Sequence, residues 1–76
     1  MQFPIENGYF IDYKEVSSGI YAGVLYGPEI DNGSQAAIGH TVDEILTTLK
    51  GLTYKAGIPD SVWDDLGYVI KDYGFI

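Results

Sequence analysis

Residues 9–26 read YFIDYKEVSSGIYAGVLY, and this stretch decides the fold. In its first half large side chains alternate with polar ones, so that Ile11 and Tyr13 share one side of an extended chain. This alternation predicts a half-buried strand over residues 9–16. The Ser-Ser-Gly that follows suits a tight turn, and a second alternating run predicts a returning strand over residues 20–27. The stretch therefore indicates a β-hairpin.

A third strand is predicted from the short apolar run that follows an acidic loop. A Gly-Pro pair ends the hairpin, and residues 29–34 are polar, with an Asp-Asn-Gly turn sequence among them. The run QAAIG then predicts a strand over residues 35–39. Residues 1–8 are expected to be a lead-in, because a proline and an Asn-Gly pair interrupt them. The expected sheet is therefore small, three-stranded and antiparallel.

The first predicted helix covers residues 42–50. Thr41 can cap its first turn while Glu44, three residues later, reaches back, which is the pattern of a capping box. Gly51 is the expected end. The buried stripe is expected to comprise Val42, Ile45, Leu46 and Leu49.

The second predicted helix covers residues 60–73, with Asp60 or Ser61 as its cap. Helical spacing divides it into two faces. The buried face is expected to comprise Val62, Leu66, Val69, Ile70 and Tyr73, and the exposed face Asp64, Asp65, Tyr68, Lys71 and Asp72. This helix therefore presents a mostly acidic surface to solvent.

These elements indicate an α+β fold in one domain, residues 1–76, in which helices cover one face of a small antiparallel sheet. The chain has no cysteine, so no disulfide supports so small a core. An exposed sheet edge in such a fold invites pairing with a second copy, which makes a homodimer plausible.

The charge of the chain is its best clue to function. Eleven carboxylates face four lysines, there is no arginine, and the formal net charge is −7. Such a surface repels nucleic acid and attracts basic surfaces. Direct nucleic-acid binding is therefore the first function class to exclude. With no charged-then-apolar leader and no apolar run of about 20 residues, we expect a cytoplasmic protein with no membrane partner.

The sequence offers no catalytic constellation, and we expect neither an enzyme nor a cofactor. His40 is the only histidine, there is no cysteine, and no serine lies in a nucleophile-elbow context. Neighbouring helical carboxylates, such as Asp64 and Asp65, point about 100° apart and do not converge on one metal ion. No phosphate-binding glycine motif is present.

Residues 39–46 read GHTVDEIL and follow the predicted hairpin and short strand. This order is similar to the N-terminal domain of HicB-type antitoxins, where a G-x-T-x-x-E-A helix follows the strands. The match covers less than half of the chain, Ile45 stands where that family usually has alanine, and no DNA-binding segment follows. The resemblance implies partner binding without operator binding. The same residues also resemble the helix start of a small, acidic, dimeric phage-encoded inhibitor that occupies the DNA-binding groove of uracil-DNA glycosylase.

We therefore expect a non-catalytic inhibitor, encoded by a phage or mobile element, that blocks a basic nucleic-acid-handling protein such as a nuclease or CRISPR effector, partly by nucleic-acid mimicry. Acidic residues would steer the encounter and tyrosines would anchor it. The candidate partner-binding residues are Tyr26, Glu29, Asp31, Asp64, Asp65, Tyr68 and Asp72.

Two alternatives stay open at this point. The first is a HicB-like antitoxin or regulatory domain that neutralises a small basic toxin. The second is a small-molecule-binding or sponge protein, with Trp63 and tyrosines lining a pocket. The absence of arginine argues against an anionic ligand in that case.

Overall fold

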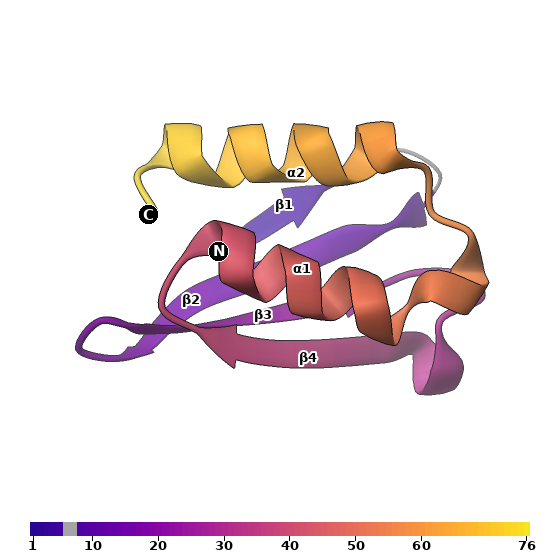
Figure 1. Cartoon of the computed structure of the whole chain (residues 1–76), viewed down its shortest axis with the longest axis horizontal. Helices are drawn as coiled ribbons and strands as arrows, with labels where there is room; N and C mark the ends of the chain where they lie inside the picture. Colours follow the sequence, from indigo (N-terminus) through magenta and orange to yellow (C-terminus); the bar gives the residue numbers. More distant parts are fainter. Residues whose placement is uncertain (6–7) are drawn as a thin grey trace.

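The computed structural model describes residues 1–5 and 8–76. Four strands and two α-helices follow one another in chain order (Figure 1). The strands are β1 (Gln2–Pro4), β2 (Phe10–Ser17), β3 (Ile20–Tyr26) and β4 (Ser34–Gly39), and the helices are α1 (Val42–Leu52) and α2 (Asp60–Tyr73). Short 3-10 turns, η2 (Asp31–Gly33) and η3 (Tyr54–Ala56), precede β4 and α2. None of the helices in the described residues is both long and apolar enough to cross a membrane.

The sheet is antiparallel throughout, in the order β1-β2-β3-β4. The predicted hairpin is confirmed as β2 and β3, with Gly19 at a φ of +73° in its turn. The expectation of three strands is wrong, because β1 adds a fourth. The pairing of Phe3 with Ile11 brings the supposed lead-in into the sheet. The other strand limits differ from the predicted ones by a single residue at one or both ends.

Both helices cover the same face of the sheet, α1 over β3 and β4 and α2 beside β1 (Figure 1). The predicted stripe of α1 is confirmed, since all four of its residues are buried. Thr41 caps α1 by accepting the Glu44 N–H through its Oγ1 at 3.1 Å. The helix continues through Gly51 to Leu52, so the expected end at residue 50 is wrong. Gly51 is exposed, and a Cβ added there would meet nothing within 4 Å. The backbone hydrogen bonds of the helix continue past it, since the Thr53 N–H donates to Leu49 O.

The limits of α2 match the prediction, but its cap and part of its buried face do not. Pro59 occupies the cap position and no side chain caps the helix. Val69 and Tyr73, expected inside, are 46% and 58% exposed. Trp63 is buried in their place. The buried arc of α2 is therefore rotated toward α1 relative to the prediction.

One hydrophobic core lies between the sheet and the helices. It joins the inward residues of β1–β4, Ile30 and the buried stripes of α1 and α2. Helix α1 approaches β3 closely at Gly23, where an added Cβ would lie 2.9 Å from Cγ2 of Ile45. The chain end closes one side of this core: the Phe75 ring lies 4.8 Å from that of Tyr13, and Ile76 O accepts the Val42 N–H at 2.6 Å.

Candidate interaction surface on α2

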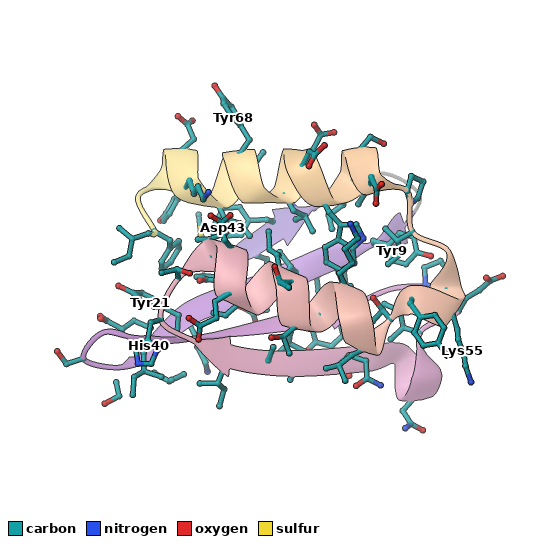
Figure 2. The ribbon with its side chains drawn as sticks, in the orientation of Figure 1. Tyr9, Tyr21, His40, Asp43, Lys55 and Tyr68 are labelled. Atoms are coloured by element: carbon teal, nitrogen blue, oxygen red, sulfur yellow. The ribbon has the colours of Figure 1, made fainter. Side chains whose placement is uncertain are left out.

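Four of the seven predicted partner-binding residues lie together on the outer side of α2. They are Asp64, Asp65, Tyr68 and Asp72, and we call them the acidic ridge. All four are exposed. Figure 2 shows Tyr68 projecting from α2 away from the sheet, and its side chain is among the most exposed of the large residues, at 73%. The ridge forms because Leu66 and Ile70 bury the opposite side of the same helix.

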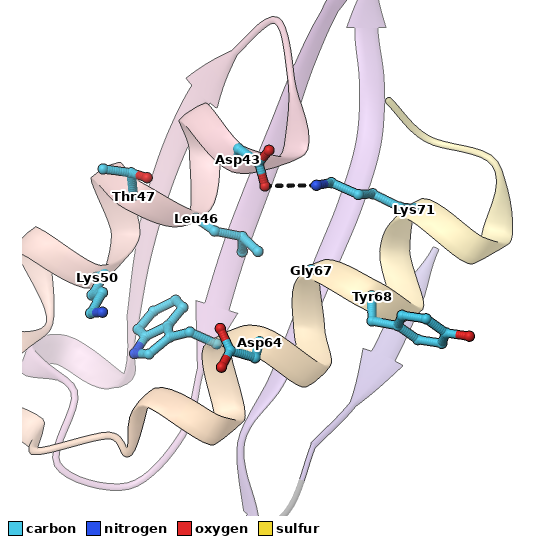
Figure 3. Close-up of a pocket in the computed structure, with 9 residues that line it drawn as sticks. Asp43, Leu46, Thr47, Lys50, Asp64, Gly67, Tyr68 and Lys71 are labelled. Carbon is cyan, nitrogen blue, oxygen red and sulfur yellow. Dashed lines mark ion pairs between the residues drawn. The ribbon is translucent and has the colours of Figure 1, made fainter.

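The lysines near α2 are engaged with other carboxylates. Lys71 Nζ lies 2.8 Å from Asp43 Oδ1, and Lys50 Nζ lies 2.9 Å from Asp60 Oδ1. Figure 3 shows the first of these pairs bridging α1 and α2. Among the described residues, no ion pair involves the three carboxylates of the acidic ridge. The ridge therefore retains its negative charge.

A shallow groove of about 510 Å³ runs between α1 and α2 beside the ridge. Its charged groups come from Asp43, Lys50, Asp64 and Lys71 (Figure 3). Leu46, Trp63 and Tyr68 line it with apolar and aromatic groups. Trp63 is 7% exposed, whereas Tyr68, which also lines the groove, is 73% exposed. The groove therefore combines charged, apolar and aromatic groups, and its accessible ring surface belongs to Tyr68 more than to Trp63.

A second groove, of about 370 Å³, separates α2 from β1 on the other side of the ridge. Its lining is mostly apolar and includes Phe3, Ile5 and Val69, with Asp65 at the ridge. The exposed Val69 was missed as a surface residue, because helical spacing alone placed it with the buried arc. The carboxylates of the ridge, the exposed Tyr68 ring and a mostly apolar groove thus lie next to one another on α2.

The other three predicted residues lie elsewhere, so the seven do not form one surface. Tyr26 is on the sheet face away from the helices, where its ring stacks on Phe10 at 4.6 Å between centroids. Glu29 is exposed in the β3–β4 connection and lines a small groove with η3. Asp31 begins η2, and its side chain lies outside the described part of the structure.

Among residues 1–5 and 8–76, no three His, Cys, Asp or Glu side chains cluster as metal ligands would. The His40 Nδ1 lies 3.7 Å from Glu44 Oε1, with both side chains more than half exposed. Burial raises the pKa of Tyr13 to about 12, and the nearby Tyr21 adds to this, but Tyr13 lies in the core.

Comparison with known proteins adds no relative. No family model matches the chain, and neither a curated protein nor a solved structure matches it. The surface of the molecule is therefore the basis from which its function is inferred.

Proposed function

We propose that this chain is a non-catalytic inhibitor that uses the acidic ridge to occupy the basic nucleic-acid site of a nuclease, CRISPR effector or similar protein. The observation that supports this function most directly is the acidic ridge itself. Its three carboxylates form no ion pair with any residue that the structure describes, and they lie beside a tyrosine ring that is 73% exposed. Charges of one sign steer encounter with an oppositely charged groove. An exposed tyrosine provides an anchor that loses its water on contact.

The spacing of the carboxylates limits how closely the ridge can resemble nucleic acid. Asp64 and Asp65 are adjacent and Asp72 follows seven positions later. At ~1.5 Å per residue, the intervals along the helix axis are therefore about 1.5 Å and about 10.5 Å. These unequal intervals do not reproduce the regular ~3.4 Å per charge of one DNA strand. The proposed mimicry is therefore of the sign of nucleic-acid charge and not of its spacing.

Displacement from DNA tests this function directly. A bacterial lysate is loaded on DNA-cellulose at an ionic strength of about 0.05 M, where screening is weak, and the column is eluted with this protein. We expect it to release at least one basic DNA-binding protein, identified by mass spectrometry. Because the acidic chain is repelled by DNA, release reports binding to the retained protein.

Two triple variants separate position from net charge. The variant D64N/D65N/D72N should release at least tenfold less protein. The matched variant E15Q/E29Q/E44Q removes the same charge away from α2 and should act as the parent does. If the parent releases no protein from the column, or if both triple variants lose release equally, the assignment of the function to the ridge is refuted.

A further inference from the structure

The two edges of the sheet differ in what their backbones offer a partner. At the end of the β3–β4 ladder, the Gly27 N–H donates to Gly33 O at 3.4 Å. Hydrogen-bonded pairs alternate along an antiparallel ladder, so residues 35, 37 and 39 also bond to β3. The N–H and C=O groups of the intervening residues therefore point away from the sheet. These residues are Ser34, Ala36 and Ile38.

The opposite edge offers fewer groups for pairing. The Tyr13 N–H donates to Met1 O and the Ile5 N–H to Tyr9 O, each at 2.8 Å. By the same alternation, Gln2 and Pro4 direct their backbones outward from β1. Proline has no N–H, so this three-residue strand offers one outward donor. Short strands and edge prolines are devices that block strand addition.

β4 carries none of these protective devices. Its six residues read SQAAIG, with no charged side chain and no proline, and its pairing with β3 shows no bulge. Ile38 is 67% exposed at this edge, although β-branched residues of its size are usually covered. A long, uncharged strand with free donors and acceptors is a template for another strand.

We propose that β4 pairs antiparallel with β4 of a second copy, giving a continuous eight-stranded sheet. In a pairing centred on Ala37, Ala36 of each copy lies opposite Ile38 of the other copy. The outward N–H and C=O groups of these two residues then form hydrogen bonds across the interface. It also places the large Ile38 side chain opposite the small Ala36 on the outer sheet face. Such a contact is self-complementary, as a two-fold interface requires.

The charge distribution leaves β4 open to a second copy. Two chains of net charge −7 repel each other wherever their acidic surfaces meet. Six of the carboxylates lie on α1 and α2, whereas β4 has none. Two copies can therefore approach along β4 with the least opposition from their own charge.

Solution mass measured against concentration tests the proposal. We expect the parent chain to reach twice its 8.4 kDa mass at high concentration. A36P removes one outward N–H and leaves the β3 ladder intact, since proline is tolerated where the N–H faces solvent. I38E places two like charges in the proposed contact. Each variant should weaken dimerisation at least tenfold, and I38E provides the test if A36P fails to fold.

The matched control is V24E, which puts the same charge on the outer face of β3, opposite Ala36 and one strand in from the edge. It should dimerise as the parent does, whereas a dimer packed through its outer sheet faces would dissociate. Higher salt should tighten the β4 contact because it screens the repulsion between the chains, opposite to its effect on a basic partner. The proposal would be overturned if the parent stays monomeric at about 1 mM, a concentration near the weak limit of specific association. Loss of the dimer in V24E would overturn it as well.

Discussion

Tyr13 has a fully buried side chain whose hydroxyl has no hydrogen-bond partner among the described residues. An unpaired buried hydroxyl costs stability. We therefore expect the free energy of unfolding of Y13F to equal that of the parent or to exceed it by up to about 1 kcal/mol.

The pH dependence of stability follows from the raised pKa of Tyr13. Between pH 10 and about 12 the unfolded chain loses this proton while the folded chain keeps it. The stability contributed by neutral Tyr13 is therefore full below pH 10 and falls as pH rises through this window.

Denaturant titrations of the parent and of Y13F at several pH values check this prediction. The parent should lose stability faster than Y13F above pH 10, by up to about 1.4 kcal/mol per pH unit. Parallel curves would mean that the hydroxyl has a partner or is open to water.

Gly27 faces the ring of Tyr9 so closely that a Cβ there would overlap Cδ1 of the ring. We expect G27A to lower the free energy of unfolding by about 1–3 kcal/mol, because the buried ring must move. G51A is the matched control. Gly51 is helical and nothing lies within 4 Å of an added Cβ, so this change should raise stability by about 0.5–1 kcal/mol. Equal effects in chemical denaturation would contradict the assigned contact.

Glu29 has a φ of +65°, a conformation that costs a non-glycine residue about 1–2 kcal/mol. E29G should therefore raise the melting temperature, corresponding to about 1 kcal/mol after the greater freedom of glycine in the unfolded chain is included. E29Q keeps the Cβ and should melt as the parent does. A melting temperature that rises in both variants would assign the effect to charge instead of backbone conformation.

At the scale of elements, the sequence predicts what strong local patterns specify. The hairpin and the stripe of α1 are confirmed because alternation and helical spacing are long enough there to be unambiguous. β1 was missed because three residues carry no period, and only its pairing with β2 makes it a strand. Gly51 was misread as a stop because tertiary packing through Leu49 holds the last turn in spite of its low helix propensity.

The candidate site was predicted in part for the same reason. Residues on one helix share a face by spacing alone, so the acidic ridge could be anticipated. Whether Tyr26 and Glu29 join that ridge depends on which sheet face the helices cover, and local sequence does not encode this. The rotation of α2, which buries Trp63 and exposes Val69, likewise depends on contacts with α1 and β1.

A pair of substitutions tests this rotation. Leu66 is 3% exposed and Val69 is 46% exposed, although spacing assigned both to the buried face. L66A should lower the free energy of unfolding by about 2–5 kcal/mol, a large share of the stability of so small a domain. V69A should change it by less than about 0.5 kcal/mol. Denaturant unfolding measures both changes. Similar losses of stability in the two variants would mean that the buried face predicted from helical spacing is correct.

At the scale of the whole molecule, the two layers differ in charge. α1 and α2 together carry six carboxylates and two lysines. The outer sheet face presents Asp12, which lies 3.3 Å from the N-terminal amine, together with Lys14. If both proposals hold, edge pairing through β4 would place two acidic ridges on the same side of one long sheet. Such a dimer could contact an extended basic groove at two points, which raises avidity without new contacts.

The concentration of charge on α2 also has a consequence for stability. Unpaired carboxylates close together repel one another, and salt screens them: the screening length falls from ~30 Å at about 0.01 M to ~3 Å at about 1 M. We expect the melting temperature of the parent to rise with sodium chloride, at a concentration where the chain is monomeric. D64N/D65N/D72N should melt higher at low salt and respond less. E15Q/E29Q/E44Q has the same net charge as D64N/D65N/D72N but keeps the acidic ridge intact. It should therefore keep more of the salt response. Equal responses in the two triple variants would mean that repulsion is spread over the molecule and that the ridge is not its main source.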